Sequence, residues 1–141
     1  MGPLDKDVVR PDGLTAVDGK LRLQIRSHWY RSLPLSSLAV LDIAIDGEPV
    51  SSEQLGIGYA DRSYAFSELP AQTDAWWYIT DPVTIEIPRD GEPGEEHRVQ
   101  VGLGLSIPYI IVGPPDARTP LLASSVTDKT LICNQESGAK R

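Results

Sequence analysis

Two histidines and one cysteine are the side chains of this 141-residue chain that are best suited to metal binding or nucleophilic catalysis. His28 and His97 are far apart in the sequence and have no second histidine near them, whereas a histidine-ligated metal centre needs several convergent ligands. Cys133 has no histidine beside it and only Lys129 as a basic neighbour, an environment that does not activate a thiol. The sequence therefore predicts no metal site, no cofactor and no catalytic residue in this chain.

Motifs for serine hydrolysis and nucleotide binding are also missing from the sequence. It contains no Gly-x-Ser-x-Gly elbow. Gly56-Ile-Gly58 and Gly102-Leu-Gly104 lack the third glycine and the following helix of a phosphate-binding loop. The chain has 20 acidic and 13 basic residues, a formal charge of −7, and binding a phosphate backbone requires clustered Lys and Arg. We therefore expect no nucleic-acid partner.

The cysteine count and the hydropathy pattern indicate the cellular compartment. A single cysteine excludes an intrachain disulfide, which is typical of a reducing environment. No apolar run approaches the roughly 20 residues that a membrane helix needs, and residues 1–6 have no signal-peptide apolar region. We expect a cytoplasmic protein that does not bind a membrane.

The segment Arg26–Ser36, with the sequence RSHWYRSLPLS, has the composition of a binding surface. A connection between strands is normally polar, yet this one carries Trp29 and Tyr30 between two arginines. Trp, Tyr and Arg are enriched in protein interfaces because they combine contact area with directional hydrogen bonds. Two interpretations remain open: the segment binds a partner, or Trp29 and Tyr30 cap one end of a hydrophobic core.

A second aromatic run, Trp76-Trp77-Tyr78-Ile79, comes later in the chain. If it is extended, Trp76 and Trp77 face opposite sides. The residues that we predict to contact a partner or to close its pocket are Arg26, His28, Trp29, Tyr30, Arg31, Leu33, Pro34, Leu35, Trp76, Trp77 and Tyr109.

Alternating apolar and polar residues predict the strands that carry these side chains. Leu21–Ile25, Leu38–Ile45, Val83–Ile87 and His97–Tyr109 each show the period of a strand with one buried face. Asp18-Gly19 and Asp46-Gly47 are two-residue hairpin signals, the wide turn Arg89–Gly94 is typical of a link between antiparallel neighbours, and Pro49 belongs on a sheet edge. These features predict an all-β protein, an antiparallel β-sandwich with jelly-roll-like connectivity.

The apolar pattern also suggests the boundaries of the folded domain. Residues 1–13 are polar and are expected to form an N-terminal arm, and residues 14–112 contain the predicted strands. Residues 113–141 contain apolar side chains at no sustained period, so we expect a C-terminal extension that either packs on a partner or returns to the sheet.

Four parts of the sequence together resemble the small β subunit of bacterial C-glycoside deglycosidases. They are RSHWYRSLPLS with the following VLDIAIDGE, Trp76-Trp77 before VTIEI, HRVQV, and Ile107-Pro-Tyr109. The resemblance extends from about Leu14 to Tyr109, and none of these motifs specifies chemistry.

The resemblance implies a two-subunit lyase that releases the aglycone from C-glycosides of plant polyphenols after a separate oxidoreductase has made the sugar 3-oxo. It implies that a TIM-barrel α subunit, related to sugar isomerases, carries the divalent metal, usually manganese, and the catalytic base. The β subunit would be a non-catalytic but required sandwich in an αβ heteromer or a higher assembly of it. The alternative is a stand-alone carbohydrate-binding sandwich, in which Trp29 or Trp76 and Trp77 stack on sugar rings.

We expect the isolated chain to bind no stoichiometric transition metal, because two separated histidines and one cysteine offer no convergent ligand set. Elemental analysis of the purified chain measures this directly. Tight, stoichiometric manganese or zinc would contradict the assignment of the metal to a partner.

Overall fold

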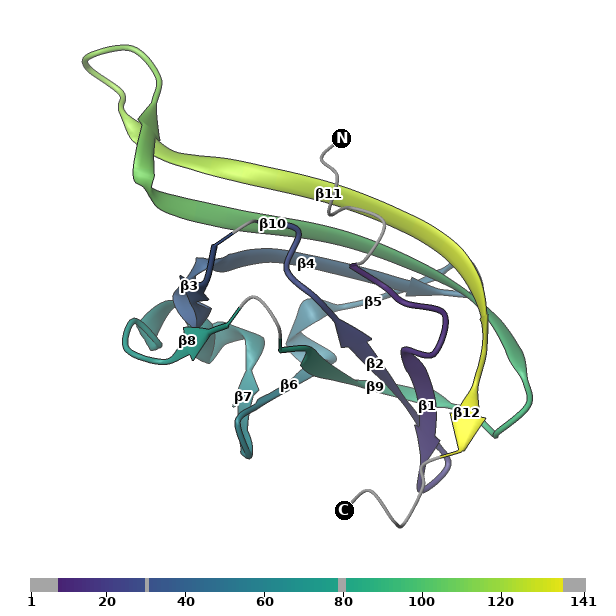
Figure 1. Ribbon diagram of the computed structural model, residues 1–141. Coiled ribbons are helices and arrows are strands. Elements are labelled where there is room, and N and C mark those ends of the chain that lie inside the picture. Colours follow the sequence, from purple (N-terminus) through teal and green to yellow (C-terminus); the bar gives the residue numbers. More distant parts are fainter. Residues whose placement is uncertain (1–7, 30, 79–80, 136–141) are drawn as a thin grey trace.

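Two β-sheets face each other across one hydrophobic core in the computed structural model, which describes residues 8–29, 31–78 and 81–135 (Figure 1). The six-stranded sheet has the order β12-β1-β2-β9-β6-β7, the four-stranded sheet has the order β11-β10-β4-β5, and a short sheet pairs β3 with β8. The predicted all-β, antiparallel class is confirmed, with β12 paired parallel to β1 as an exception. Jelly-roll connectivity stays a prediction.

The strands are β1 (Leu14–Val17), β2 (Lys20–Ile25), β3 (Leu33–Pro34), β4 (Leu38–Ile45), β5 (Glu48–Val50), β6 (Gly56–Tyr59), β7 (Arg62–Ala65), β8 (Trp76–Trp77), β9 (Val83–Asp90), β10 (Glu96–Val112), β11 (Thr119–Ile132) and β12 (Asn134–Gln135). The 3-10 helices are η2 (Leu35–Ser37), η3 (Ser52–Gln54) and η4 (Phe66–Ala71). Within the described residues, no helix has the length and apolar character that a membrane crossing requires.

Alternate residues of the long strands fill the core, as their period predicts. Leu21, Leu23 and Ile25 of β2 are buried on one face of the six-stranded sheet. In β10 the odd-numbered residues from Val99 to Ile107 are buried from the other side. Because side chains of a strand alternate between its two faces, both sheets direct one apolar face inward.

Two Asp-Gly pairs make the hairpin turns that the sequence predicts. Asp18 and Gly19 have φ of 53° and 79°, and Asp46 and Gly47 have φ of 53° and 86°. Positive φ at both central residues is the type I′ geometry, whose twist matches that of the flanking strands. Pro49 lies on β5, an edge strand, as expected.

The wide turn Arg89–Gly94 does not join neighbours. It connects β9 of the six-stranded sheet to β10 of the four-stranded sheet, so the prediction of an antiparallel pair at this turn was wrong. A turn of this length suits either arrangement, and only the packing of the two sheets decides between them.

The C-terminal boundary of the sandwich also differs from the expected one. Beyond Val112 the chain turns back and forms β11, which pairs with β10 from Val112–Thr119 to Glu96–Ile132. The core-facing side of β11 carries Ser125 and Thr127, which are buried although polar. These residues remove the hydrophobic alternation, so the strand depends on backbone pairing that its own sequence does not reveal.

The N-terminal segment likewise enters the fold earlier than residue 14. Val8 and Val9 are buried in the core. The Arg26 backbone N–H donates to Val8 O at 2.9 Å, and Lys129 Nζ donates to Val9 O at 2.6 Å. The N-terminal segment therefore contributes to the core from Val8 onward.

We expect a chain that ends at Val112 to lose cooperative unfolding. The truncation removes β11 and β12, leaves one whole edge of β10 without backbone partners, and takes Leu131 and Cys133 out of the core. Thermal melting followed by circular dichroism, with the full chain as reference, tests this. A cooperative transition near that of the full chain would show that the sandwich is complete without β11.

His97 links the start of β10 to the turn between β4 and β5. Its Nδ1 donates to Asp46 Oδ2 at 2.7 Å and its Nε2 to Glu95 Oε1 at 3.3 Å. Burial lowers the pKa of His97, but the hydrogen bonds to the two carboxylates outweigh it and leave the pKa above its usual value. The hydrogen bond from His97, together with one from the Arg98 backbone, lowers the pKa of Asp46. These contacts give His97 a structural role in the fold.

The two pKa shifts define a pH window in which this contact stabilises the fold. A raised pKa at His97 stabilises the native state fully below its unfolded pKa of about 6.5, and this contribution is lost as the pH rises through the folded value. A lowered pKa at Asp46 stabilises above its unfolded pKa of about 3.9 and is lost as the pH falls through the folded value. The contact is therefore strongest between about pH 4 and pH 6.5.

We expect His97→Gln to lower the melting temperature more at about pH 5.5 than at about pH 8.5. The matched control is Asp128→Asn, which removes an exposed ion pair with Arg98 that stays charged throughout this range. Asp128→Asn should lower the melting temperature by a small amount that is the same at the two pH values. Equal losses for His97→Gln would contradict the assigned role of the charged ring.

Candidate docking end and ligand pocket

The aromatic segment packs against the β10–β11 hairpin. Trp29 Nε1 donates to Tyr109 Oη at 2.6 Å, and the Arg31 guanidinium lies 5.4 Å from the centre of the Tyr109 ring. His28 Nε2 donates to Ala123 O on β11 at 3.1 Å. Trp29 is half-buried against the core. It therefore combines a core contact with the side-chain exposure that an interface residue needs.

A bulge in β10 brings Tyr109 to this position. Ile107 lies opposite Leu121 and Ile111 lies opposite Pro120, so residues 108–110 have no directly opposite residue. Pro108 has no N–H to donate to the ladder, and bulges are the usual place for proline inside a sheet. A bulge also changes the direction in which side chains point, which explains how Tyr109 reaches Trp29.

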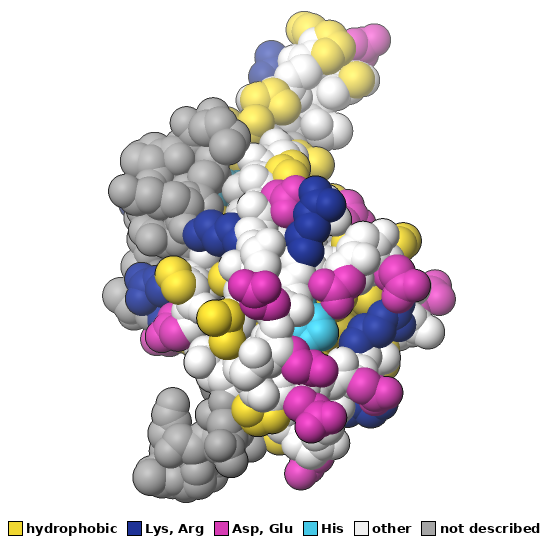
Figure 2. Space-filling view, turned by 90° about the vertical axis from the view of Figure 1, so that its right-hand side faces the viewer, with side chains coloured by type: hydrophobic (Ala, Val, Ile, Leu, Met, Phe, Trp, Pro, Cys, Tyr) yellow, Lys and Arg dark blue, Asp and Glu magenta, His cyan; other side chains and the backbone are white. Residues whose placement is uncertain are grey.

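Residues 107–122, which include the bulge, form a hairpin that extends past the rest of the sandwich, and we call it the arm (Figure 1). Every residue from Ile111 to Pro120 is exposed. Tyr109, Ile111, Val112 and Leu122 are large apolar side chains that the arm leaves in solvent. Figure 2 shows hydrophobic side chains on the arm, at the top of the view, and mainly acidic side chains spread over the end of the molecule that faces the viewer. The arm is thus an apolar projection from an acidic protein.

The structure separates the predicted interface residues into exposed and buried groups. Leu33, Leu35 and Trp77 are buried in the core and cannot contact a partner, so these three predictions were wrong. The pairing of β3 with β8 turns Leu33 and Trp77 inward together, and Leu35 is buried at the start of η2. Arg26, His28 and Pro34 are half-buried, Arg31, Trp76 and Tyr109 are exposed, and Tyr30 lies outside the described residues.

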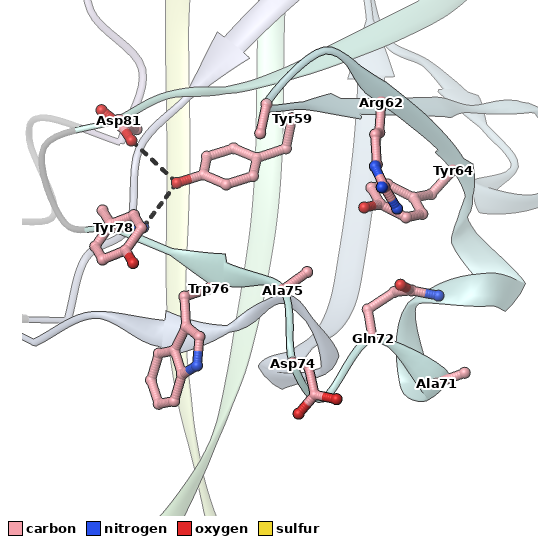
Figure 3. A pocket seen from close by; sticks show the side chains of 11 residues that line it. Tyr59, Arg62, Tyr64, Ala71, Gln72, Asp74, Ala75, Trp76, Tyr78 and Asp81 are labelled. Carbon is pink, nitrogen blue, oxygen red and sulfur yellow. Dashed lines mark hydrogen bonds between the residues drawn. The ribbon is translucent and has the colours of Figure 1, made fainter.

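Trp76 borders a pocket of about 580 Å³ at the same end of the sandwich (Figure 3). Trp76 and Tyr78 form one wall, and Arg62 and Tyr64 of β7 form the other. Trp76 is 47% exposed. The predicted alternation between Trp76 and Trp77 is confirmed, and Trp76 faces this pocket while Trp77 faces the core. The other lining residues are Tyr59, Ala60, Ala71, Gln72, Asp74, Ala75 and Asp81.

Tyr59 holds the Trp76–Tyr78 wall in place. Its hydroxyl donates to Asp81 Oδ2 at 3.0 Å and accepts the Tyr78 backbone N–H at 2.9 Å. Trp77 Nε1 donates to Asp81 O at 2.8 Å. Burial raises the pKa of Tyr59, and the Asp81 carboxylate raises it further against the opposing effect of the Tyr78 N–H. Tyr59 is therefore a neutral donor at physiological pH.

The described residues do not fit a metal ion. Across residues 8–29, 31–78 and 81–135, no group of three or more His, Cys, Asp or Glu side chains is arranged to hold one. His97 bonds two carboxylates of its own chain and His28 a backbone carbonyl, so neither ring has an environment built for metal ligation.

Sequence reasoning missed the arm and most of the pocket. A signal for the arm exists in Ile110-Ile111-Val112, an apolar run directly before Gly113-Pro114-Pro115. The pocket has no comparable signal, because its residues come from two stretches, 59–64 and 71–81, that do not form one motif.

Comparisons with known proteins match most of this chain. A family model described as C-glycoside deglycosidase beta subunit matches residues 4–109. A C-glycoside deglycosidase beta subunit of Microbacterium trichothecenolyticum is 36% identical over 109 residues, which cover 77% of this chain and 79% of the relative. The 3'-dehydrocarminate deglycosidase beta subunit of a Microbacterium species is 31% identical over 124 residues, or 88% and 91% of the two chains. A C-glycoside deglycosidase beta subunit of Arthrobacter globiformis is 32% identical over 106 residues, or 74% and 80%.

Proposed function

The chain belongs to the C-glycoside deglycosidase beta subunit family, and we propose that it is the non-catalytic but required β subunit of a two-subunit enzyme that cleaves the carbon–carbon bond between a sugar and a polyphenol. Its partner in this proposal is a catalytic α subunit with a TIM-barrel fold. Three relatives carry the name of a deglycosidase beta subunit, and this is the support for a partner.

The proposed reaction is a β-elimination on a 3-oxo-C-glycoside. A general base removes the proton at C2, which the neighbouring ketone acidifies. The electrons of that bond form a double bond between C1 and C2, and the bond from C1 to the aryl carbon breaks. The aryl carbon takes up a proton, so the products are the free aglycone and an unsaturated keto sugar.

We assign the metal and the base to the α subunit. Within the described residues no donor set fits a metal, and His97 and His28 bond a carboxylate and a backbone carbonyl rather than a nucleophile. Polarising a keto sugar is chemistry that a divalent cation such as manganese supplies when it is bound. The role left for this chain is to bind the α subunit and to complete or cover its pocket.

The exposed apolar side chains of the arm are the observation that supports a docking site there. Tyr109, Ile111, Val112 and Leu122 lie in solvent on a projecting hairpin, and burying such side chains against a partner gains about 25 cal/mol per Å² of apolar surface. Contiguous exposed apolar surface on an otherwise polar protein usually marks an interaction site.

The aromatic segment Arg26–Ser36 contacts the base of the arm and holds it in place. The bonds from Trp29 and His28 and the stacking of Arg31 all reach β10 or β11 at the base of the arm. A hairpin held in one orientation loses less conformational entropy when it binds. Trp29 therefore acts mainly as a brace, while Arg31 and Tyr109 remain exposed for contact. The core-cap interpretation of this segment therefore applies to Trp29, and the partner-binding interpretation applies to Arg31.

We expect Ile111→Asp to weaken binding of the α subunit by about 2 kcal/mol or more, roughly 30-fold, because it places a charge in a desolvated interface. Arg31→Ala should weaken binding in the same direction, and the activity of the reconstituted enzyme should fall with affinity. Titration of the β subunit with a separately purified α subunit measures the affinity, and melting of the free β subunit measures its stability.

The matched control for Ile111→Asp is Ile132→Asp. The two isoleucines are 48% and 56% exposed and lie on the same β10–β11 ladder, but Ile132 is at the end of β11 far from the arm. The control should leave affinity and melting unchanged. Equal effects of the two variants would exclude the arm as the docking site, and a free chain that recruits no partner would contradict the subunit role.

A further inference from the structure

Two exposed aromatic side chains form one wall of the pocket. Trp76 and Tyr78 are both exposed and both line the pocket. Figure 3 shows them on the same side, with Arg62 and Tyr64 across from them and Gln72 and Asp74 between. The volume of about 580 Å³ lies within the range of about 300–1,000 Å³ that is common for small-molecule sites.

This wall is fixed before any ligand arrives. Trp77, between the two exposed rings, is buried and pairs with Leu33 across β3 and β8. Tyr59 bonds the Tyr78 backbone and Asp81 together. Between the two walls, Gln72 Nε2 donates to Glu68 O at 3.1 Å. A preformed site of this kind avoids the cost of ordering its side chains on binding.

The chemistry of the lining selects a neutral ligand rich in hydroxyl groups. One positive side chain, Arg62, and two negative ones, Asp74 and Asp81, line the pocket, so neither a phosphate nor a strong cation is favoured. A hydroxyl group both donates and accepts hydrogen bonds. The carboxylates accept, the guanidinium donates, and the Tyr64 hydroxyl can do both.

The aromatic wall adds a requirement for a ring with a flat apolar face. The face of an aromatic ring carries negative charge density, which attracts polarised C–H groups stacked on it. A pyranose sugar presents such C–H groups on one face and hydroxyl groups around its edge. It is therefore the class of molecule that matches both walls.

We infer that this pocket is a sugar-binding site, in which Trp76 and Tyr78 stack on a pyranose ring and Asp74, Arg62 and Tyr64 bind its hydroxyl groups. The residues that line the site all come from this chain. It is separate from the arm, and a sugar bound here can be free or can be the sugar part of a C-glycoside.

Isothermal titration of the full-length chain tests this inference with three probes: D-glucose, a C-glucosyl flavone and the same flavone without its sugar. We expect saturable binding of the two sugar-bearing probes and a change in tryptophan fluorescence, because Trp76 leaves water. Tighter binding of the C-glucosyl flavone than of glucose would identify the glycoside as the source of the sugar. Binding of the sugar-free flavone alone, or of no probe, would overturn the inference.

Paired variants separate the pocket from general effects on the chain. Trp76→Ala should weaken sugar binding at least tenfold, whereas Val126→Ala, at another exposed apolar side chain, should leave it unchanged. Asp74→Asn should weaken binding and Asp42→Asn, at an exposed carboxylate on β4, should not. Equal effects within either pair would overturn the inference. These measurements need no α subunit, so a failure here leaves the docking proposal intact, and failed docking leaves this site intact.

Discussion

The pairing of β10 with strands on both of its sides is the interaction on which the rest of this structure depends. β4 pairs with the inner part of β10, and β11 pairs with nearly the whole length of β10. Gly102 and Gly104 lie where β4 approaches, and a Cβ at Gly104 would come within 2.8 Å of the Val40 side chain. The register of β10 against β4 shifts between Gly104 and Leu105, and a glycine inside a strand often marks such an irregularity. Without this double pairing the core would lose one wall, and the arm would have no base.

The functional end of the molecule follows from the same ladder. Because β10 and β11 continue past the sandwich, their backbone groups stay bonded to each other while their side chains remain in solvent. Pro108 interrupts the ladder and directs Tyr109 to Trp29, which ties the arm to the aromatic segment. Exposed apolar side chains make an isolated chain less soluble, and the formal charge of −7 counteracts this. The pocket lies at the same end, on strands that need no contact with the arm.

Local chemistry explains which parts of the fold the sequence predicts. The type I′ turns at Asp18-Gly19 and Asp46-Gly47 need positive φ at both positions, a requirement that few residue pairs meet. The inward faces of β2 and β10 follow from alternation alone. β11 escaped prediction because Ser125 and Thr127 occupy its buried positions, and its stability comes from bonds to β10 rather than from its own pattern. The family model ends at Tyr109, so the resemblance gave no help in this region either.

The sequence by itself determined the all-β class, the two hairpins, the family and the opposite directions of Trp76 and Trp77, because each depends on a few adjacent residues. Only the tertiary structure decided which aromatic and leucine side chains remain accessible. Leu33, Leu35 and Trp77 looked like interface residues, but all three are buried in the core, and the pairing of β3 with β8 turns Leu33 and Trp77 inward. The orientation of the arm likewise depends on a distant contact, from Trp29 to Tyr109, and the orientation of Trp76 depends on the pairing of β3 with β8. Burial depends on what packs on the other side of a strand, and that partner comes from a distant part of the chain.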